Sequence, residues 1–409
     1  MKIVHTSDWH IGQMLCARKR HEEFEAFLAW LAALIDREQI DVLLVAGDVF
    51  DTPLPGNRAQ ALYYGFLSRV AHSCCRHVVV IGGNHDSPSF LNAPKELLRA
   101  LHVHVVGAAS GDPAEEVLLL RQPDGRPELI VCAIPYLRDR DIRLAEAGES
   151  IEEKEQKIQE GIRRHYAAVA KLAVEQRQSL GVSIPIVAMG HLFTAGGQTV
   201  DGDGVRELYI GSLAHLPAAQ LPTAWDYLAL GHLHVPQKVG GSEWVRYSGS
   251  PLPMGFGEAK QQKSLCLLTC IEAGIAVTLY PVPVFQPLES VRGSWPMIVE
   301  RLRALVAAGS RAWLEVIYEG EERLTDLRER LEPLVSGSAM EILRIKNSAL
   351  YTQALCQQQA DETLNDLDLY EVFDRCLAAH GIPAAQQIVM RHTYQEAVTA
   401  LQEADSQAE

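Results

Sequence analysis

Five short apolar segments, each followed at once by polar residues of the types that bind metals, constrain this chain more than any other feature. The segments cover residues 2–7, 41–46, 77–81, 184–189 and 227–230. Between the first two, apolar residues recur at three- and four-residue spacing from Phe24 to Ile35, as in an amphipathic helix. Apolar runs that alternate with amphipathic segments are typical of an α/β fold, and we expect the five segments to be buried strands.

Two further local signals lie between these strands. Residues 118–121 and 129–133 flank the turn sequence Pro-Asp-Gly and predict a hairpin. Ser150 and Glu153 have the spacing of a capping box, which predicts the start of a long helix. Gly181 would end that helix, because glycine adopts the left-handed conformation that commonly follows a last helical turn.

The chain changes character beyond residue 281. Residues 294–308, 313–318, 325–334 and 340–345 predict helix, strand, helix and strand, and a polar stretch with three glutamines follows at 357–359. Amphipathic helices are expected at residues 366–380 and 384–404. We therefore predict three parts. They are a main domain (1–285), a small α/β domain (286–350), and a linker with a helical tail (351–409).

Composition narrows the class of protein. With 409 residues, 47% hydrophobic and 22% charged, the chain is long enough for two domains and too apolar for disorder. No apolar run reaches the roughly 18 residues of a membrane span, and the N-terminus lacks the apolar region of a signal peptide. The eight cysteines include no CxxC pair, so we expect reduced thiols in the cytoplasm.

The net charge of −15 argues against a simple nucleic-acid-binding module, which is usually basic. Its distribution qualifies that argument, since residues 361–409 hold ten acidic side chains against Arg375 and Arg391. The rest of the chain is only mildly negative. Bound divalent cations would offset part of that charge locally.

The polar residues at the strand ends are the candidate functional site. They are Asp8, His10, Asp48, Asn84, His191, His232 and His234. In open α/β sheets ligands bind at the carboxyl ends of the strands, so these residues are expected to meet. Asp8 and His10 are two apart and would point to one side of an extended backbone. Glycine precedes Asp48, Asn84, His191 and His232, which would let the chain turn sharply there.

Oxygen and nitrogen ligands without thiolates suit Mn²⁺, Mg²⁺ or iron better than a structural zinc site. Seven ligands are too many for one ion and fit two ions that share a carboxylate. Two ions about 3.5–4 Å apart can clamp the attacking and leaving oxygens of a phosphoryl displacement. Taken singly, a Gly-Asp after a strand is more often a turn, and a Gly-His more often a core or surface histidine. We expect His5 to pack inside the first strand. His102 and His104 alternate as on one face of a sheet and follow no glycine, so we expect them to be core or surface histidines.

The segments DWHIG, GDVFD, GGNHDS, MGHL and LGHLHVPQ occur in an order that resembles the calcineurin-like metallophosphoesterase superfamily. Within it, the chain resembles the SbcD family of nuclease subunits. The resemblance implies a sandwich of mixed sheets flanked by helices, with a small α/β capping domain and a helical C-terminal tail. It also implies one ion on Asp8, His10, Asp48 and His234, and another on Asp48, Asn84, His191 and His232. His85 would protonate or stabilise the leaving oxygen, and Asp86 could orient the His85 ring.

The resemblance further implies a substrate and a partner. The substrate would be DNA, on which the protein would act as an endonuclease and as a 3′-to-5′ exonuclease at double-strand ends and hairpins. The cofactors would be two divalent metal ions, with Mn²⁺ expected and Mg²⁺ as the alternative. The partner would be an SbcC ATPase, which the C-terminal helices of this chain would bind. Two copies of this chain would form a homodimer within a heterotetramer. This chain has no GxxxxGK[ST] phosphate loop of its own.

Alternatives to this interpretation remain open at this point. The chain could be a small-molecule phosphodiesterase or phosphatase, or a non-catalytic scaffold for DNA ends. Arg18, Lys19 and Arg20 could contact a phosphate backbone, or they could be a solvated lead into a helix. The tail could fold back onto the main domain instead of binding a partner.

Overall fold

The computed structural model describes residues 1–143, 150–195, 216–272, 274–320, 324, 326–347, 370, 373–374, 377 and 383–403. The chain divides into two compact units, Met1–Phe285 with Gln402–Glu409, and Gln286–Leu401. Assignment of residues 1–285, 286–350 and 351–409 to three domains stays a prediction. Two expected features lie outside the described residues, the linker around 357–359 and most of the helix 366–380.

The first sheet carries the first three predicted strands. Its order is β16-β15-β1-β4-β5-β6. The bounds are β16 (Gly274–Pro281), β15 (Ser264–Ile271), β1 (Lys2–Thr6), β4 (Val42–Ala46), β5 (His77–Ile81) and β6 (Val103–Val106). Strands β1, β4, β5 and β6 run parallel, whereas β15 is antiparallel to both β1 and β16. Strands β4 and β5 are buried along their whole length, as expected for apolar runs covered on both faces.

The second sheet carries the other two. Its order is β13-β14-β12-β9-β8-β7. The bounds are β13 (Gln237–Lys238), β14 (Val245–Tyr247), β12 (Tyr227–Gly231), β9 (Ile186–His191), β8 (Pro127–Ala133) and β7 (Val117–Arg121). The inner strands β14, β12, β9 and β8 are parallel, and β7 returns antiparallel to β8 as the predicted hairpin.

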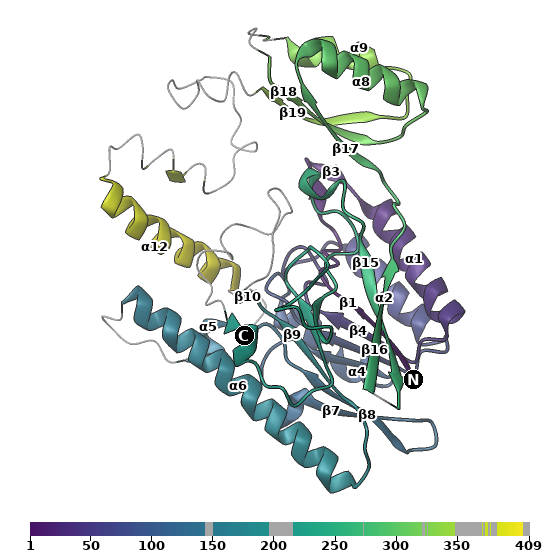
Figure 1. The fold of residues 1–409 in the computed structure, drawn as a ribbon, viewed down its shortest axis with the longest axis vertical. Helices are drawn as coiled ribbons and strands as arrows, with labels where there is room; N and C mark the ends of the chain where they lie inside the picture. The colour runs from purple at the N-terminus through teal and green to yellow at the C-terminus, as the bar shows by residue number, and fades with distance from the viewer. Residues whose placement is uncertain are drawn as a thin grey trace. The chain divides into compact units, whose positions relative to one another are not determined.

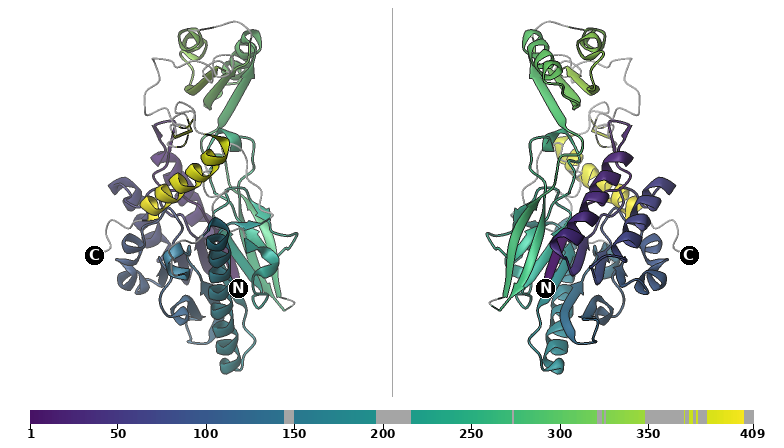
Figure 2. Two further views of the ribbon diagram at one scale, coloured as in Figure 1. Left: turned by 90° about the vertical axis from the view of Figure 1, so that its left-hand side faces the viewer. Right: turned by 90° about the vertical axis from the view of Figure 1, so that its right-hand side faces the viewer.

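The two sheets and their helices form four layers (Figures 1 and 2). One apolar core joins the inner faces of the sheets, with Val79 from the first and Leu129 from the second. Helices α1 (His21–Glu38) and α2 (Asn57–Val70) cover the outer face of the first sheet. Helix α6 (Ile151–Leu180) covers the outer face of the second. The predicted sandwich of mixed sheets flanked by helices is confirmed.

Short elements complete this unit. They are β2 (Met14–Leu15), β3 (Arg18–Lys19), α3 (Pro88–Asn92), α4 (Lys95–Arg99), η1 (Pro113–Glu116), α5 (Asp139–Ile142), β10 (Thr194–Ala195), β11 (Leu216–Pro217), η2 (Ala218–Gln220) and η3 (Phe256–Glu258). The capping box predicted for α6 is confirmed, because the Ser150 hydroxyl accepts from the Glu153 amide and the Glu153 carboxylate accepts from the Ser150 amide. Gly181 ends this helix with φ +65°.

The second unit contains a three-stranded parallel sheet, order β17-β18-β19. Its elements are β17 (Leu288–Gly293), α8 (Trp295–Ala307), β18 (Trp313–Tyr318), α9 (Leu327–Val335) and β19 (Glu341–Asn347), and α12 (Ala384–Glu403) follows. Helices α8 and α9 bury Ile298, Leu302 and Leu331 against the sheet residues Leu314 and Val316. The predicted helix–strand–helix–strand order is confirmed, and β17 is an additional strand.

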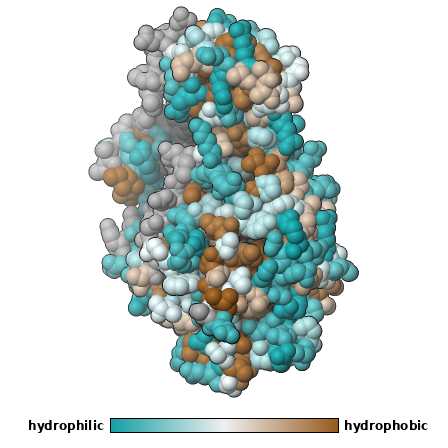
Figure 3. Space-filling model, turned by 45° about the vertical axis from the view of Figure 1, so that its right-hand side comes forward, coloured by the Kyte–Doolittle hydropathy of each residue, from teal (hydrophilic) through white to brown (hydrophobic). Residues whose placement is uncertain are grey.

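The face of the molecule in Figure 3 is mostly polar. In Figure 3 hydrophilic side chains cover most of the face in view, with hydrophobic ones in smaller groups between them. Within the described residues, the helices include none that is long and apolar enough to cross a membrane.

Candidate metal centre

The seven predicted ligands meet where strands of both sheets end. Asp8 and His10 follow β1, Asp48 follows β4, and Asn84 follows β5. His191 is the last residue of β9, and His232 and His234 follow β12. All seven are buried, with at most 4% of each residue exposed. The structure thus brings the seven residues together at strand ends, and strands of both sheets contribute.

The ligand atoms form two clusters. In the first, the Nε2 atoms of His10 and His234 lie 3.2 Å apart, and Asp8 lies beside them. In the second, the Oδ1 atom of Asn84 lies 3.0 Å from both His191 Nε2 and His232 Nδ1.

Asp48 lies between the two clusters. Its Oδ2 atom is 3.6 Å from His10 Nε2 and 3.3 Å from His191 Nε2. Its Oδ1 atom accepts the backbone amide proton of His85 at 2.9 Å. A carboxylate with one oxygen facing ligands of both clusters has the position that a bridging ligand requires.

The buried side chains of the centre shift one another's pKa values. Burial raises the pKa of Asp8 to about 6. Burial would also raise the pKa of Asp48, but His191 and His85 hold it well below its usual range. Burial would lower the pKa of His191 and His10, but nearby carboxylates, Asp48 among them, raise each to about 9. Two buried carboxylates thus need positive charge beside them.

These contacts fit a divalent cation in each cluster. Two imidazole nitrogens 3.2 Å apart repel each other unless a proton or a cation lies between their lone pairs. The Nδ2 atom of Asn84 is buried and has no hydrogen-bond partner in the described part of the chain, while its Oδ1 atom faces the histidines. Oxygen and nitrogen donors in this arrangement suit Mn²⁺ or Mg²⁺.

Comparison with known proteins agrees with this geometry. Residues 1–236 match the model of the calcineurin-like phosphoesterase family, and residues 284–381 match the type 5 capsule protein repressor C-terminal domain. The SbcD subunit of nuclease SbcCD from Escherichia coli (strain K12) is 37% identical over 96% of this chain and 97% of its own length.

The chain belongs to the SbcD family of calcineurin-like phosphoesterases. It is a metal-dependent phosphodiester hydrolase of a nuclease family. The SbcD protein of Rhodobacter capsulatus is 37% identical over 69% of each chain, and that of Bacillus subtilis is 35% identical over 66% of each chain.

The backbone from Asp8 to His10, in the segment DWHIG, differs from the extended form that was expected there. Both residues have positive φ, +53° and +46°, as do Asp48 (+48°) and His232 (+103°). The amide of Asp8 donates to the Gly47 carbonyl at 3.0 Å, and that of His10 donates to the Asp48 carbonyl at 2.9 Å. The expectation of an extended backbone is therefore wrong here. Left-handed conformations of non-glycine residues cost about 1–3 kcal/mol each and cluster at functional sites.

The glycines beside the ligands leave room for neighbouring strands. A Cβ atom on Gly83 would lie 2.1 Å from Asp48 Oδ1, and one on Gly47 would lie 2.2 Å from His191 Nδ1. A Cβ atom on Gly231 would lie 1.8 Å from the carbonyl oxygen of Ala46. The end of β12 thus lies directly against the end of β4. Gly47 and Gly231 therefore let the two sheets approach each other, and Gly83 lets the loop after β5 approach Asp48.

Replacing Gly231 by alanine should therefore lower the free energy of unfolding by about 1–3 kcal/mol, because backbone of the other sheet must shift. Urea unfolding in the presence of a chelator measures this without a contribution from metal. Gly111→Ala is the control, since nothing lies within 4 Å of its Cβ position, and its effect should stay below about 1 kcal/mol. Equal effects of the two substitutions would contradict the packing argument.

His85 and Asp86 lie in the loop after β5, next to Asn84. The His85 Nδ1 atom lies 2.9 Å from the carbonyl oxygen of Asp51, which accepts its proton. Burial, aided by the charge of His10, lowers the pKa of His85, against the opposite effect of Asp48. The Asp86 carboxylate accepts amide protons from Gly83, Val49 and Phe50 at 2.9–3.1 Å.

Asp86 thus ties the loop after β5 to the loop after β4. The His85 ring is held by the Asp51 carbonyl, and an orienting role for Asp86 stays a prediction. No role was predicted for Asp51 from the sequence, although this residue ends the segment GDVFD. Its carboxylate lies 3.4 Å from His10 Nδ1. Only its place three residues after Asp48 could have indicated it.

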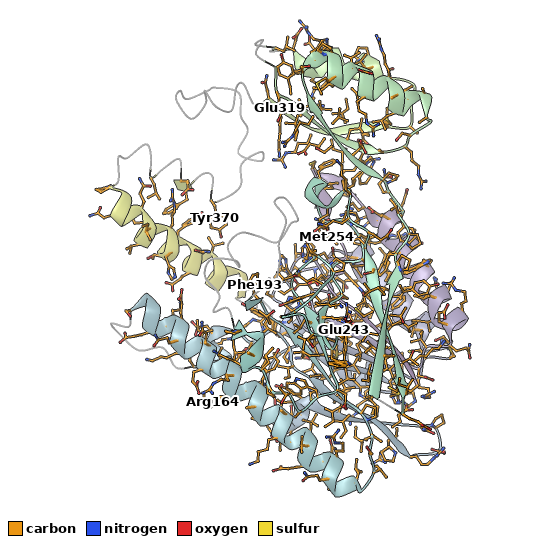
Figure 4. The ribbon with its side chains drawn as sticks, in the orientation of Figure 1. Arg164, Phe193, Glu243, Met254, Glu319 and Tyr370 are labelled. Atoms are coloured by element: carbon orange, nitrogen blue, oxygen red, sulfur yellow. The ribbon has the colours of Figure 1, made fainter. Side chains whose placement is uncertain are left out.

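Other sequence candidates have structural roles. Arg20 is 2% exposed, donates to Glu23 at 2.8 Å and is therefore not a surface contact for phosphate. Arg18 and Lys19 are exposed in strand β3. His5 is fully buried between the Tyr227 hydroxyl and the Leu230 carbonyl, which confirms that it packs. Phe193, labelled in Figure 4, lies with its ring centroid 6.4 Å from that of His232.

Proposed function

We propose that this chain is a two-metal DNA nuclease in which Asp48 bridges the ions. One ion would be held by Asp8, His10, Asp48 and His234, and the other by Asp48, Asn84, His191 and His232. The observation that carries the proposal is the position of Asp48 Oδ2 between His10 Nε2 and His191 Nε2. Mn²⁺ suits these ligands best, and Mg²⁺ is the alternative.

The division of chemical work follows from the ligands and their neighbours. Bound ions would supply charge that lowers the pKa of water and neutralises phosphate oxygens. His85, adjacent to ligand Asn84, would give a proton to the leaving oxygen, with its ring held by the Asp51 carbonyl. Asp86 keeps the loop that carries both residues in place.

DNA as substrate rests on membership of the SbcD family. As in the resemblance, we propose endonuclease and 3′-to-5′ exonuclease activity at double-strand ends and hairpins. Arg18 and Lys19 of β3 are exposed basic side chains, the kind that contacts phosphates. A non-catalytic scaffold is disfavoured because all seven ligands and His85 lie together. A small-molecule phosphodiesterase uses the same metal chemistry and is the second candidate.

A substrate panel separates these candidates. Purified chain supplied with Mn²⁺ would receive labelled duplex, hairpin and single-stranded DNA alongside p-nitrophenyl phosphate esters. We expect Mn²⁺-dependent cleavage of the duplex and the hairpin. Hydrolysis of the small esters with no cleavage of any DNA would reject the nuclease proposal in favour of the second candidate.

The tail is proposed to bind the SbcC ATPase, as part of a homodimer within a heterotetramer. Two aromatic side chains of the tail contact each other, since the rings of Phe373 and Tyr394 stack 4.0 Å apart. Outside that contact, Ile388, Val389 and Met390 of α12 are 68%, 54% and 41% exposed. Exposed apolar side chains on a helix are candidates for docking in a partner's groove.

Deleting residues 360–409 should abolish co-purification with SbcC and ATP-stimulated cleavage, while leaving Mn²⁺-dependent cleavage by the isolated chain intact. The physical reason is that the described metal ligands all lie before residue 235. Co-expression and pull-down, followed by the cleavage assay, measure both quantities. Full-strength SbcC binding by the truncated chain, or its unfolding, would instead favour a tail that folds onto the main domain.

A further inference from the structure

A buried ion pair lies directly behind one of the histidine ligands. Glu258, the last residue of η3, is 0% exposed, and Lys263 is 4% exposed. Lys263 Nζ lies 2.6 Å from Glu258 Oε2. The same oxygen accepts the backbone amide proton of Met254 at 2.9 Å, and Met254 is labelled in Figure 4. Neither residue belongs to the seven ligands.

Both members of this pair contact His234. Glu258 Oε1 lies 3.7 Å from Nδ1 of the His234 ring. Lys263 Nζ donates to the His234 carbonyl oxygen at 2.9 Å and to the Ser250 hydroxyl at 3.1 Å. The other ring nitrogen, Nε2, faces His10 Nε2 at 3.2 Å. The pair therefore touches the side of His234 that points away from the metal centre.

We propose that Glu258, supported by Lys263, is a positioning residue that orients His234 Nε2 toward the ion shared with Asp8 and His10. A cation on Nε2 requires the ring proton to be on Nδ1, which faces the Glu258 carboxylate. Carboxylates behind metal-binding histidines fix the tautomer and the ring orientation, and their loss typically costs 10- to 100-fold in metal affinity. The proposal rests on the two-ion centre proposed above.

Two observations favour a functional role over a purely structural one. A buried ion pair is often no more stabilising than apolar residues of the same size, so its presence beside a ligand calls for another reason. In addition, the two clusters differ behind their histidines. His10 Nδ1 faces the Asp51 carboxylate at 3.4 Å, whereas His191 Nδ1 meets the neutral carbonyl of Ala46 at 2.9 Å. The effect of Glu258 should therefore be confined to one ion.

The test is Glu258→Gln in the full chain. Calorimetric titration of the metal-free protein with Mn²⁺ should resolve two binding steps in the parent. In the variant one step should weaken about 10- to 100-fold, while the other keeps its affinity. Electron paramagnetic resonance should then show an uncoupled single Mn²⁺ at one equivalent per chain.

Glu116→Gln is the matched control. Glu116 is equally buried and lies 2.8 Å from the Nε2 atom of His165, which is not a metal ligand, so both Mn²⁺ steps should be unchanged. The double variant Glu258→Gln/Lys263→Gln removes both charges, leaves no unpaired ammonium group, and should show the same loss at one site.

Three results would overturn the inference. The first is that both variants with Glu258→Gln bind both ions as tightly as the parent. The others are equal weakening of the affinity for both ions, and unfolding of the metal-free double variant. Fewer than two Mn²⁺ ions bound by the parent would reject the proposed two-ion function itself, which separates the two failures.

Discussion

Replacing His85 by glutamine should lower the single-turnover rate constant of cleavage about 10²- to 10⁴-fold and leave two metal ions bound. Glutamine keeps a hydrogen-bonding group but cannot hand over a proton. The His85 backbone amide, which donates to Asp48 Oδ1 at 2.9 Å, is retained in the variant. Single-turnover cleavage of labelled duplex, together with metal analysis of the dialysed protein, measures both quantities.

Asp86→Asn is the contrasting variant in the same loop. Its carboxylate accepts three backbone amide protons, so the amide group of asparagine would place a donor against a donor. We expect loss of about 1–3 kcal/mol in the free energy of unfolding. Near-normal cleavage by His85→Gln, or loss of metal in that variant, would remove His85 from the role of acid.

Replacing Asp48 by alanine should remove both ions and abolish cleavage. Asp48 Oδ2 faces His10 in one cluster and His191 in the other, so the variant loses a ligand of each ion at once. The histidines around Asp48 would also lose the negative charge of its carboxylate. Metal content after equilibrium dialysis against Mn²⁺ measures the effect.

Asn84→Ala should chiefly loosen one ion, because the contacts of its Oδ1 atom are with His191 and His232 of a single cluster. Asp124→Ala, in the exposed turn between β7 and β8, is a control that should retain both ions. Two tightly bound ions in Asp48→Ala would contradict the bridging assignment.

The strand ends could be predicted because they depend on local sequence. Each apolar run fixes a buried strand, and each polar residue after it is at the end of that strand whatever its partners are. The pairing of strands depends on contacts between distant residues. The sequence therefore did not show that β9 and β12 belong to a second sheet, or that β15 inserts beside β1.

The neighbours of the ligands were harder to predict for the same reason. Glu258 and Lys263 come after β14 in the sequence and reach His234 only through the fold. The left-handed backbone at Asp8 and His10 depends on hydrogen bonds to the loop after β4, which no local pattern reveals. Arg20 belongs to a run of basic residues that is typical of a surface patch, but hydrogen bonds to Glu23 and Gln13 keep its side chain buried.

The central claim is that two ions share Asp48. Anomalous diffraction at the manganese edge, from crystals of the full chain grown with Mn²⁺, tests it most directly. We predict two peaks about 3.5–4 Å apart, one beside Asp8, His10 and His234 and the other beside Asn84, His191 and His232, with Asp48 contacting both. A single peak, or two peaks of which only one contacts Asp48, would contradict the account.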